Sequence, residues 1–313
     1  MFSSLTENGD IWSLPVDANL GKVTGQPQRV TKEQGAEYYP SVSLDGKTLA
    51  FVSHRDGNPD IWTKDLESGK ETSTVGTPTV ELHPAVSADG FRVAYLSLSQ
   101  TQGGAIIGAI RVIPVTGGIS KELCSSCSWP LDWSSDERRM VFNELHGNQL
   151  VRYLMDVPTA KKSHLLDHSS PQIGFSADGD WITFVVQPVP GIASPLGCRI
   201  FIAPYKSESI REEQWIPLSE VSTWDDKPRW SPDGNLIYFV SDRDGFACIW
   251  AQKLDPKTKR PREGAFAVYH SHESRCSIKN QGYGGLEISV ARDKIVFSMV
   301  ELTGNIWTAN LKS

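Results

Sequence analysis

Short apolar segments separated by tight polar turns recur along the whole chain. The stretch RWSPDGNLIYFVSDRDGFACIW (229–250) repeats the frame of PSVSLDGKTLAFVSHRDGNPDIW (40–62). Each contains a Ser-x-Asp-Gly turn, in which Asp can bond its own backbone and Gly accepts a positive φ. The flanking segments are short and rich in Val, Ile, Phe, Tyr and Trp, which favour β-strands. The pattern therefore predicts tightly connected antiparallel strands.

The same turn recurs at intervals of about 40–60 residues, a period typical of repeat architectures. It stands at Asp45-Gly46, Asp89-Gly90, Asp136-Glu137, Asp178-Gly179, Asp233-Gly234 and, in degraded form, Asp293-Lys294. Two apolar segments follow each turn and a weaker one follows most of these, so each unit predicts a four-stranded antiparallel meander with strands a, b, c and d. One such sheet cannot bury both of its faces, whereas radial repetition packs sheet on sheet. The predicted fold is all-β, a β-propeller of four-stranded antiparallel blades.

The number of blades depends on how the two ends of the chain are interpreted. Seven segments match strand c, including DIWSLPV (10–16) near the start and NIWTANL (305–311) at the end. The first unit lacks strand a, and the last unit lacks strand d. The chain is interpreted either as a single propeller domain, 1–313, excised from a longer protein, or as a ring whose first and last units share one blade. Seven blades are favoured, with six as the alternative.

The repeated phrase also carries a family resemblance. The pattern P-x-W-S-P-D-G-x-x-I-x-F-x-S-x-R-D-G-x-x-x-I-W resembles the WD40-like PD40 repeats of TolB-like β-propellers, most strongly over 39–66, 83–96 and 226–254. Such repeats also occur in prolyl-oligopeptidase-like peptidases and beside bacterial sensor kinases and transcription regulators. The resemblance implies the fold but leaves the function open, because propellers host unrelated functions.

The long loops predict which face of the propeller carries the functional site. The b–c and d–a loops of a meander share one face, and here they include 99–109, 187–198, 219–228 and 270–285. Loops of this length are usually functional or mobile. The residues that directly precede a proline before strand a are expected at the same mouth of the central channel: Tyr39, His83, Trp129, Ser170 and Lys227. With Asp226 they would suit recognition of a peptide or polar ligand. The alternative is that they only plug the channel.

Two histidines in the 270–285 loop are candidate ligand-binding residues and candidate metal ligands. His270 and His272 stand at i and i+2, so on a strand both would point to one side, with Glu273 nearby. The resemblance extends to oligogalacturonate lyases, which have a His-x-His and a central metal, and so implies a metal-dependent polysaccharide lyase as an alternative function. His83 and Gln281 could converge with the pair. The other interpretation is two surface histidines in a loop.

Other catalytic patterns are missing from the sequence. CSSC (124–127) is a lone C-x-x-C without the second pair of ligands that a zinc site needs, and pairing of Cys124 with Cys127 is left open. There is no G-x-S-x-G elbow and no phosphate-cradling glycine loop. No cofactor and no catalytic constellation are therefore expected.

Charge and hydropathy exclude two further classes. The net charge is −6 with no dense Lys/Arg stripe, which argues against a nucleic-acid partner. No apolar run approaches the roughly 18–20 residues that cross a bilayer, and the N-terminus does not resemble a signal peptide. The favoured function is a non-catalytic binding or sensor module that recognises a protein, peptide or small ligand as part of a larger bacterial signalling or regulatory protein. The alternatives are the lyase and an accessory propeller of a prolyl-oligopeptidase-like peptidase. The sequence leaves the compartment and oligomeric state open.

Overall fold

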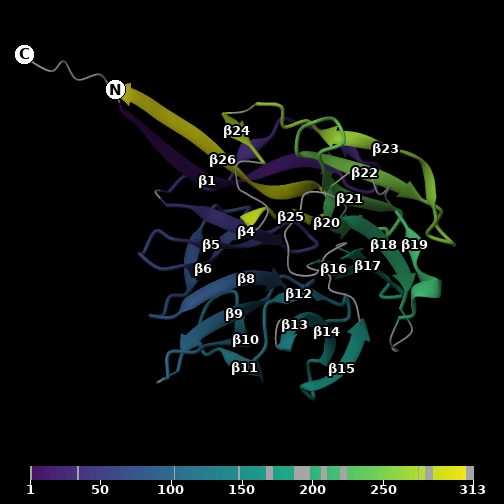
Figure 1. Ribbon diagram of the computed structural model, residues 1–313, viewed down its shortest axis with the longest axis horizontal. Helices are drawn as coiled ribbons and strands as arrows, with labels where there is room; N and C mark the ends of the chain where they lie inside the picture. The colour runs from purple at the N-terminus through teal and green to yellow at the C-terminus, as the bar shows by residue number, and fades with distance from the viewer. Residues whose placement is uncertain are drawn as a thin grey trace, which may run out of the picture.

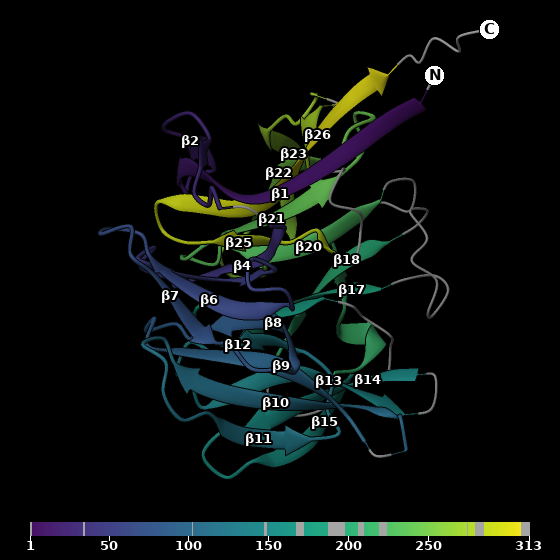
Figure 2. The ribbon, with the colours of Figure 1, turned by 90° about the vertical axis from the view of Figure 1, so that its left-hand side faces the viewer.

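The strands of the protein form six antiparallel sheets arranged around an axis. The computed structural model describes residues 2–33, 35–101, 103–146, 149–166, 172–186, 198–205, 210–218, 224–273, 275–278 and 285–307. Within these residues the six sheets stand as the blades of a propeller, seen end-on in Figure 1 and from the side in Figure 2. The predicted all-β propeller of four-stranded blades is therefore confirmed.

Five blades are four-stranded meanders. Blade 2 holds β4 (Glu37–Val42), β5 (Thr48–Ser53), β6 (Asp60–Asp65) and β7 (Glu71–Val75). Blade 3 holds β8 (Val80–Val86), β9 (Arg92–Gln100), β10 (Ile106–Pro114) and β11 (Lys121–Ser125). Blade 4 holds β12 (Pro130–Trp133), β13 (Arg139–His146), β14 (Gln149–Asp156) and β15 (Lys161–Leu166). Blade 5 holds β16 (Ile173–Phe175), β17 (Trp181–Val186), β18 (Arg199–Pro204) and β19 (Ile216–Pro217), with the short 3-10 helix η1 (Glu212–Gln214) before β19. Blade 6 holds β20 (Asp225–Trp230), β21 (Leu236–Ser241), β22 (Cys248–Leu254) and β23 (Pro261–Tyr269).

Both ends of the described chain build blade 1. It holds β25 (Ile288–Val290), β26 (Lys294–Trp307), β1 (Phe2–Asp17), β2 (Lys22–Val23), β3 (Gln28–Arg29) and β24 (Cys276–Ser277). β1 and β26 pair antiparallel from Phe2↔Trp307 to Pro15↔Lys294. The far ends of these two strands project beyond the disc (Figures 1 and 2). The N-terminal strand thus closes the ring by supplying strand c of the last repeat.

The preference for seven blades was wrong, and the six-bladed alternative with a shared blade is correct. The residues predicted to form separate strands b and c of the last unit belong to one continuous strand, β26. In blades 2 and 6 a turn with a positive-φ glycine, Gly57 or Gly245, separates these strands. The segment between Phe297 and Trp307 has no such turn, so the backbone continues straight and pairs with β1.

The apolar core lies between the blades. The second strand of each blade has both faces covered, which gives continuous burial rather than alternation; all six residues of β21 are buried. At the junction of blades 1 and 2, Ile11, Leu49, Phe51 and Val296 are fully buried against one another. Ring closure therefore depends on apolar packing between blades as well as on strand pairing within blade 1.

Candidate ligand-binding channel

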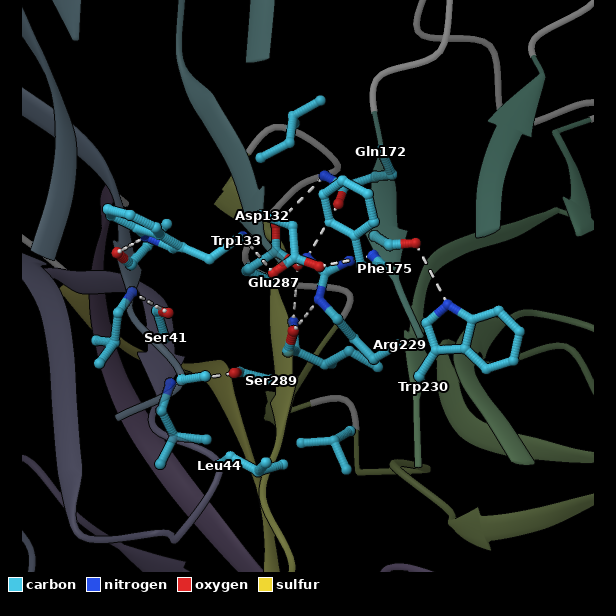
Figure 3. A pocket seen from close by; sticks show the side chains of 18 of the residues that line it. Ser41, Leu44, Asp132, Trp133, Gln172, Phe175, Arg229, Trp230, Glu287 and Ser289 are labelled. Atoms are coloured by element: carbon cyan, nitrogen blue, oxygen red, sulfur yellow. Dashed lines mark hydrogen bonds and ion pairs between the residues drawn. The ribbon is translucent and has the colours of Figure 1, made fainter. Parts of the chain in front are cut away.

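The innermost strands of the six blades surround a central cavity of about 190 Å³. These strands are β4, β8, β12, β16, β20 and β25. Tyr39, His83 and Trp129 line one end of the cavity, and Leu44 and Pro232 from the turns after the innermost strands line the other. Figure 3 shows polar side chains from several blades gathered in the middle. The cavity is thus a polar chamber on the propeller axis.

One position in each innermost strand links its blade to the next. It lies two residues before the Ser of the Ser-x-Asp turn. In the turn after β25 Ala291 replaces this Ser, and the position is counted from Ala291. Its occupants around the ring are Ser41, Ala85, Asp132, Gly174, Arg229 and Ser289. Each of these six residues takes part in a hydrogen bond across one of the six blade junctions, so the ring of links is complete among the described residues.

The chemistry of each link depends on the side chain at that position. Ser41 Oγ accepts the Val86 amide at 2.9 Å, and Asp132 Oδ2 accepts the Phe175 amide at 2.8 Å. Ser289 Oγ accepts a hydrogen bond from the Val42 amide of blade 2 in the same way. Where the position has no polar side chain, a tryptophan of the next blade donates to its carbonyl. Trp133 Nε1 bonds Ala85 O at 2.9 Å, and Trp230 plays the same part for Gly174.

Trp133→Phe is expected to destabilise the protein more than Trp62→Phe does. Phenylalanine removes the indole N–H that bonds Ala85 O, and a buried carbonyl then loses its partner. The Trp62 Nε1 atom is buried without a hydrogen-bond partner among the described residues, so the matched change there loses no such bond. Urea unfolding should show a difference of about 1–2 kcal/mol between the two variants. Equal losses would mean that the link contributes no net stability.

Arg229 is the cation at the centre of the chamber. Its Nη2 atom donates to Gln172 Oε1 at 3.0 Å and pairs with the carboxylate of Glu287. Its Nε atom donates to Ile288 O at 3.0 Å, which is the link between blades 6 and 1. Gln172 Nε2 in turn donates to Glu287 Oε2 at 3.3 Å. These three side chains form a closed network across blades 5, 6 and 1 (Figure 3).

Asp132 is a carboxyl of the chamber whose pKa is strongly raised. Burial raises its pKa to about 6, although the Phe175 amide, the Arg229 charge and the Trp133 amide act against this rise. A Cβ atom placed on Gly174 would lie 3.2 Å from Asp132 Oδ2, so the glycine leaves the room that the carboxylate occupies. Asp132 therefore carries its charge at neutral pH at a cost to the folded state.

The predicted mouth residues Tyr39, His83 and Trp129 form an aromatic row. The ring centroids of Tyr39 and His83 lie 4.2 Å apart, and those of His83 and Trp129 lie 5.2 Å apart. Tyr39 and His83 have left-handed φ values of 53° and 51°, and Lys227 has 57°. Each of these three sits where the register of the innermost strand shifts, so a bulge turns its side chain out of the strand ladder. Such backbone costs about 1–2 kcal/mol per residue and clusters at functional sites.

Charged groups adjoin this row. Burial, aided by the charge of Lys227, lowers the pKa of His83 to about 3, so the imidazole is neutral near pH 7. Asp226 and Lys227 are both buried, and burial raises the pKa of Asp226. Lys227 Nζ lies 3.9 Å from Asp226 Oδ2, beyond hydrogen-bond distance. No hydrogen bond of this ammonium is found among the described residues.

The structure brings only some of the sequence-predicted site residues to the cavity. Tyr39, His83 and Trp129 line the cavity, and the charge of Lys227 acts on His83. Ser170 and Gln281 lie outside the described residues. His270 and His272 follow β23, the outermost strand of blade 6, and do not line the cavity.

Sequence reasoning missed the polar set in the middle of the chamber. That set comprises Asp132, Gln172, Arg229 and Glu287. Aligning the repeats on the turn serine would have placed Asp132 and Arg229 at one ring position. No comparable signal marks Gln172 or Glu287.

Two further features bear on questions that the sequence raised. Cys124 and Cys127 form a disulfide. No helix among the described residues is long and apolar enough to span a membrane.

Comparison with known proteins agrees with the fold and with the repeats. No protein-family model matches the chain. A TolB homolog of Chlorobium chlorochromatii is 28% identical over 145 residues, 46% of this chain and 32% of that protein. A TolB homolog of Chlamydia muridarum is 36% identical over 66 residues, 21% of this chain and 15% of that protein. The matched segments thus span a third or less of these curated relatives.

Solved structures show the same architecture. A candidate TolB of Agrobacterium tumefaciens has a TM-score of 0.65 at 16% identity, with 95% of this chain and 99% of that chain covered. TolB of Acinetobacter baumannii has a TM-score of 0.57 at 16% identity, with 93% and 63% covered. An oligogalacturonate lyase in complex with manganese has a TM-score of 0.57 at 15% identity, with 88% and 80% covered. At these identities the structural likeness concerns the fold. In fold and in these sequence matches, the chain is similar to TolB-like β-propellers.

Proposed function

We propose that this propeller is a non-catalytic binding module that takes a carboxylate-bearing peptide segment of a partner protein at the aromatic mouth of its channel. The observation that carries the proposal is the row Tyr39–His83–Trp129 beside the buried Lys227 ammonium. Flat aromatic faces give apolar contact area at low entropic cost, and an ammonium that makes no hydrogen bond among the described residues favours an anionic group. Such a module suits a regulatory or sensory protein.

The protonation states at the mouth fit a carboxylate ligand. His83 is neutral because its pKa is lowered to about 3, so one ring nitrogen can donate and the other accept. Asp226 offsets part of the Lys227 charge across a gap of 3.9 Å. A ligand carboxylate that approaches the ammonium would form the shorter, charge-assisted hydrogen bond.

The non-catalytic part of the proposal has support inside the chamber. Asp132 and Arg229 are titratable groups of the cavity, and both hold neighbouring blades together through backbone hydrogen bonds. The lyase alternative would place its metal on His270 and His272, which lie on the outer side of blade 6 rather than at the cavity. The peptidase alternative would need a separate catalytic domain. Neither is adopted as the proposed function.

The proposal predicts that peptides selected against this protein carry Asp, Glu or a free terminal carboxylate. A random peptide library displayed on phage would be panned on the wild-type chain, and the affinities of enriched peptides measured by calorimetry. Lys227→Met should weaken binding about 10–100-fold, since a charge-assisted hydrogen bond is lost. Trp129→Ala should weaken it through lost ring contact.

The matched control is Phe91→Ala. Phe91 is 70% exposed in the turn between β8 and β9, at the opposite end of the blade from the mouth. This variant should bind like the wild type. The proposal fails if no peptide is enriched, or if enriched peptides bind both mouth variants with wild-type affinity.

A further inference from the structure

Four side chains with metal-binding donor atoms meet on the outer strands of blade 6. Asp244 lies in the turn between β21 and β22, and Cys248 begins β22. His270 and His272 follow the end of β23, which pairs with β22 at Ile249↔Tyr269. One donor atom from each of the four residues lies within 4.8 Å of every other. We propose that this cluster is a structural zinc site, independent of the channel and its ligand.

The donor atoms of three ligands form a tight triangle. His270 Nδ1 lies 3.0 Å from Asp244 Oδ2, and His272 Nε2 lies 3.0 Å from the same oxygen. The two ring nitrogens are 3.1 Å apart. Ligands bound tetrahedrally at 2.0–2.1 Å from zinc stand about 3.3 Å from one another. The triangle is therefore close to the size that a zinc ion would hold.

Hydrogen bonds alone do not satisfy this triangle. An ionised carboxylate oxygen only accepts, and each neutral imidazole nitrogen either donates or accepts. If both nitrogens donate to Asp244, the contact between them joins two donors. If one nitrogen accepts from the other, its contact with Asp244 joins two acceptors. A cation at the centre removes the conflict, because all three atoms then offer it a lone pair.

The surrounding structure holds the ligands in this arrangement. Asp244 Oδ1 accepts the Phe246 amide at 3.2 Å, which leaves Oδ2 for the histidines. The Phe246 ring stacks on His272 with centroids 4.4 Å apart. The Ser271 amide donates to Cys248 Sγ at 3.3 Å, a bond that would support a thiolate ligand. Contacts of this kind orient ligands and are part of most metal sites.

The donor set selects the ion and indicates its role. Two imidazoles, a thiol and a carboxylate suit zinc, whereas magnesium, calcium and manganese prefer oxygen donors. Four protein ligands close a tetrahedral site, so no position is left for a catalytic water. The ion would fasten the segment after β23 to the β21–β22 turn, at the rim of the b–c and d–a face.

The test is metal binding by the full chain after removal of metals with a chelator. Zinc titration followed by native mass spectrometry should give one ion per chain. Cobalt(II) should give the visible absorption of a tetrahedral site together with a thiolate charge-transfer band. Cys248→Ser should abolish that band, and His272→Gln should weaken zinc binding at least about 100-fold.

Two variants serve as matched controls. Cys276→Ser and His164→Gln change the same residue types outside the cluster, and both should keep wild-type zinc affinity and the cobalt spectrum. His272 is exposed, and serine is close to cysteine in size at the buried Cys248, so both ligand variants should keep the wild-type circular dichroism. The proposal is overturned if the wild type binds no stoichiometric zinc, or if Cys248→Ser and His272→Gln bind it as the wild type does.

Discussion

Replacing Phe297 with alanine is expected to lower the free energy of unfolding by about 3–5 kcal/mol. Phe297 is fully buried in β26, where it pairs with Trp12 of β1 and with Ile288 of β25. Its ring also packs on Tyr269 of blade 6, with centroids 5.4 Å apart. The side chain thus joins three strands of the closing blade to the blade before it. Alanine would leave a cavity at the point where the two ends of the chain complete the ring.

Urea unfolding would measure this loss against two references. Phe51→Ala removes an equally buried ring from blade 2, which is built from one continuous segment, and should cost a similar amount. Phe91→Ala removes a ring that is 70% exposed and should stay within about 0.5 kcal/mol of the wild type. If Phe297→Ala behaves like Phe91→Ala, apolar packing in blade 1 does not hold the ring closed.

The architecture was predictable because blades 2 to 6 repeat the same local chemistry. A Ser-x-Asp turn fixes the start of the second strand, and the Ser hydroxyl to Asp carboxylate bond recurs from Ser43–Asp45 to Ser231–Asp233. The blade count was not predictable in the same way. It depends on whether residues 294–307 turn or continue, and strand pairing with a segment almost 300 residues earlier decides that.

Residues of the candidate site were predictable only where a recurring sequence feature, such as the proline of the innermost strand, marks their position in a repeat. The proline after Tyr39, His83 and Trp129 identified the mouth, and the structure brings these three rings together. Of the four residues in the proposed zinc cluster, the sequence indicated only His270 and His272 as candidate metal ligands. Asp244 and Cys248 come from the preceding hairpin, and the register of β22 on β23 alone brings them close.

Asp132→Ser is expected to become more stable relative to the wild type as pH rises from about 4 to 7. Burial raises the pKa of Asp132 from an ordinary 3.8 to about 6, so the folded protein holds this proton more tightly than the unfolded chain. Well below pH 3.8 both states are protonated and the carboxyl costs nothing. The cost grows as pH rises from about 4 to 6, where the unfolded chain is ionised and the folded state still holds the proton, and it levels off at about 2–3 kcal/mol above pH 6. Serine removes this cost but can still accept the Phe175 amide, as Ser41 accepts the Val86 amide at 2.9 Å.

Urea unfolding of both proteins at several pH values isolates this group, because the other carboxyls titrate alike in each. Asp136→Ser provides a control of opposite sign. Its hydrogen bond from Ser134 lowers the pKa of Asp136, so its contribution to stability is present above pH 4 and lost in acid. That variant should therefore lose stability relative to the wild type as pH rises toward 4, and the difference should stay level from pH 4 to 7. A flat difference between wild type and Asp132→Ser from pH 4 to 7 would show that the chamber leaves the Asp132 carboxyl as well solvated as it is in the unfolded chain.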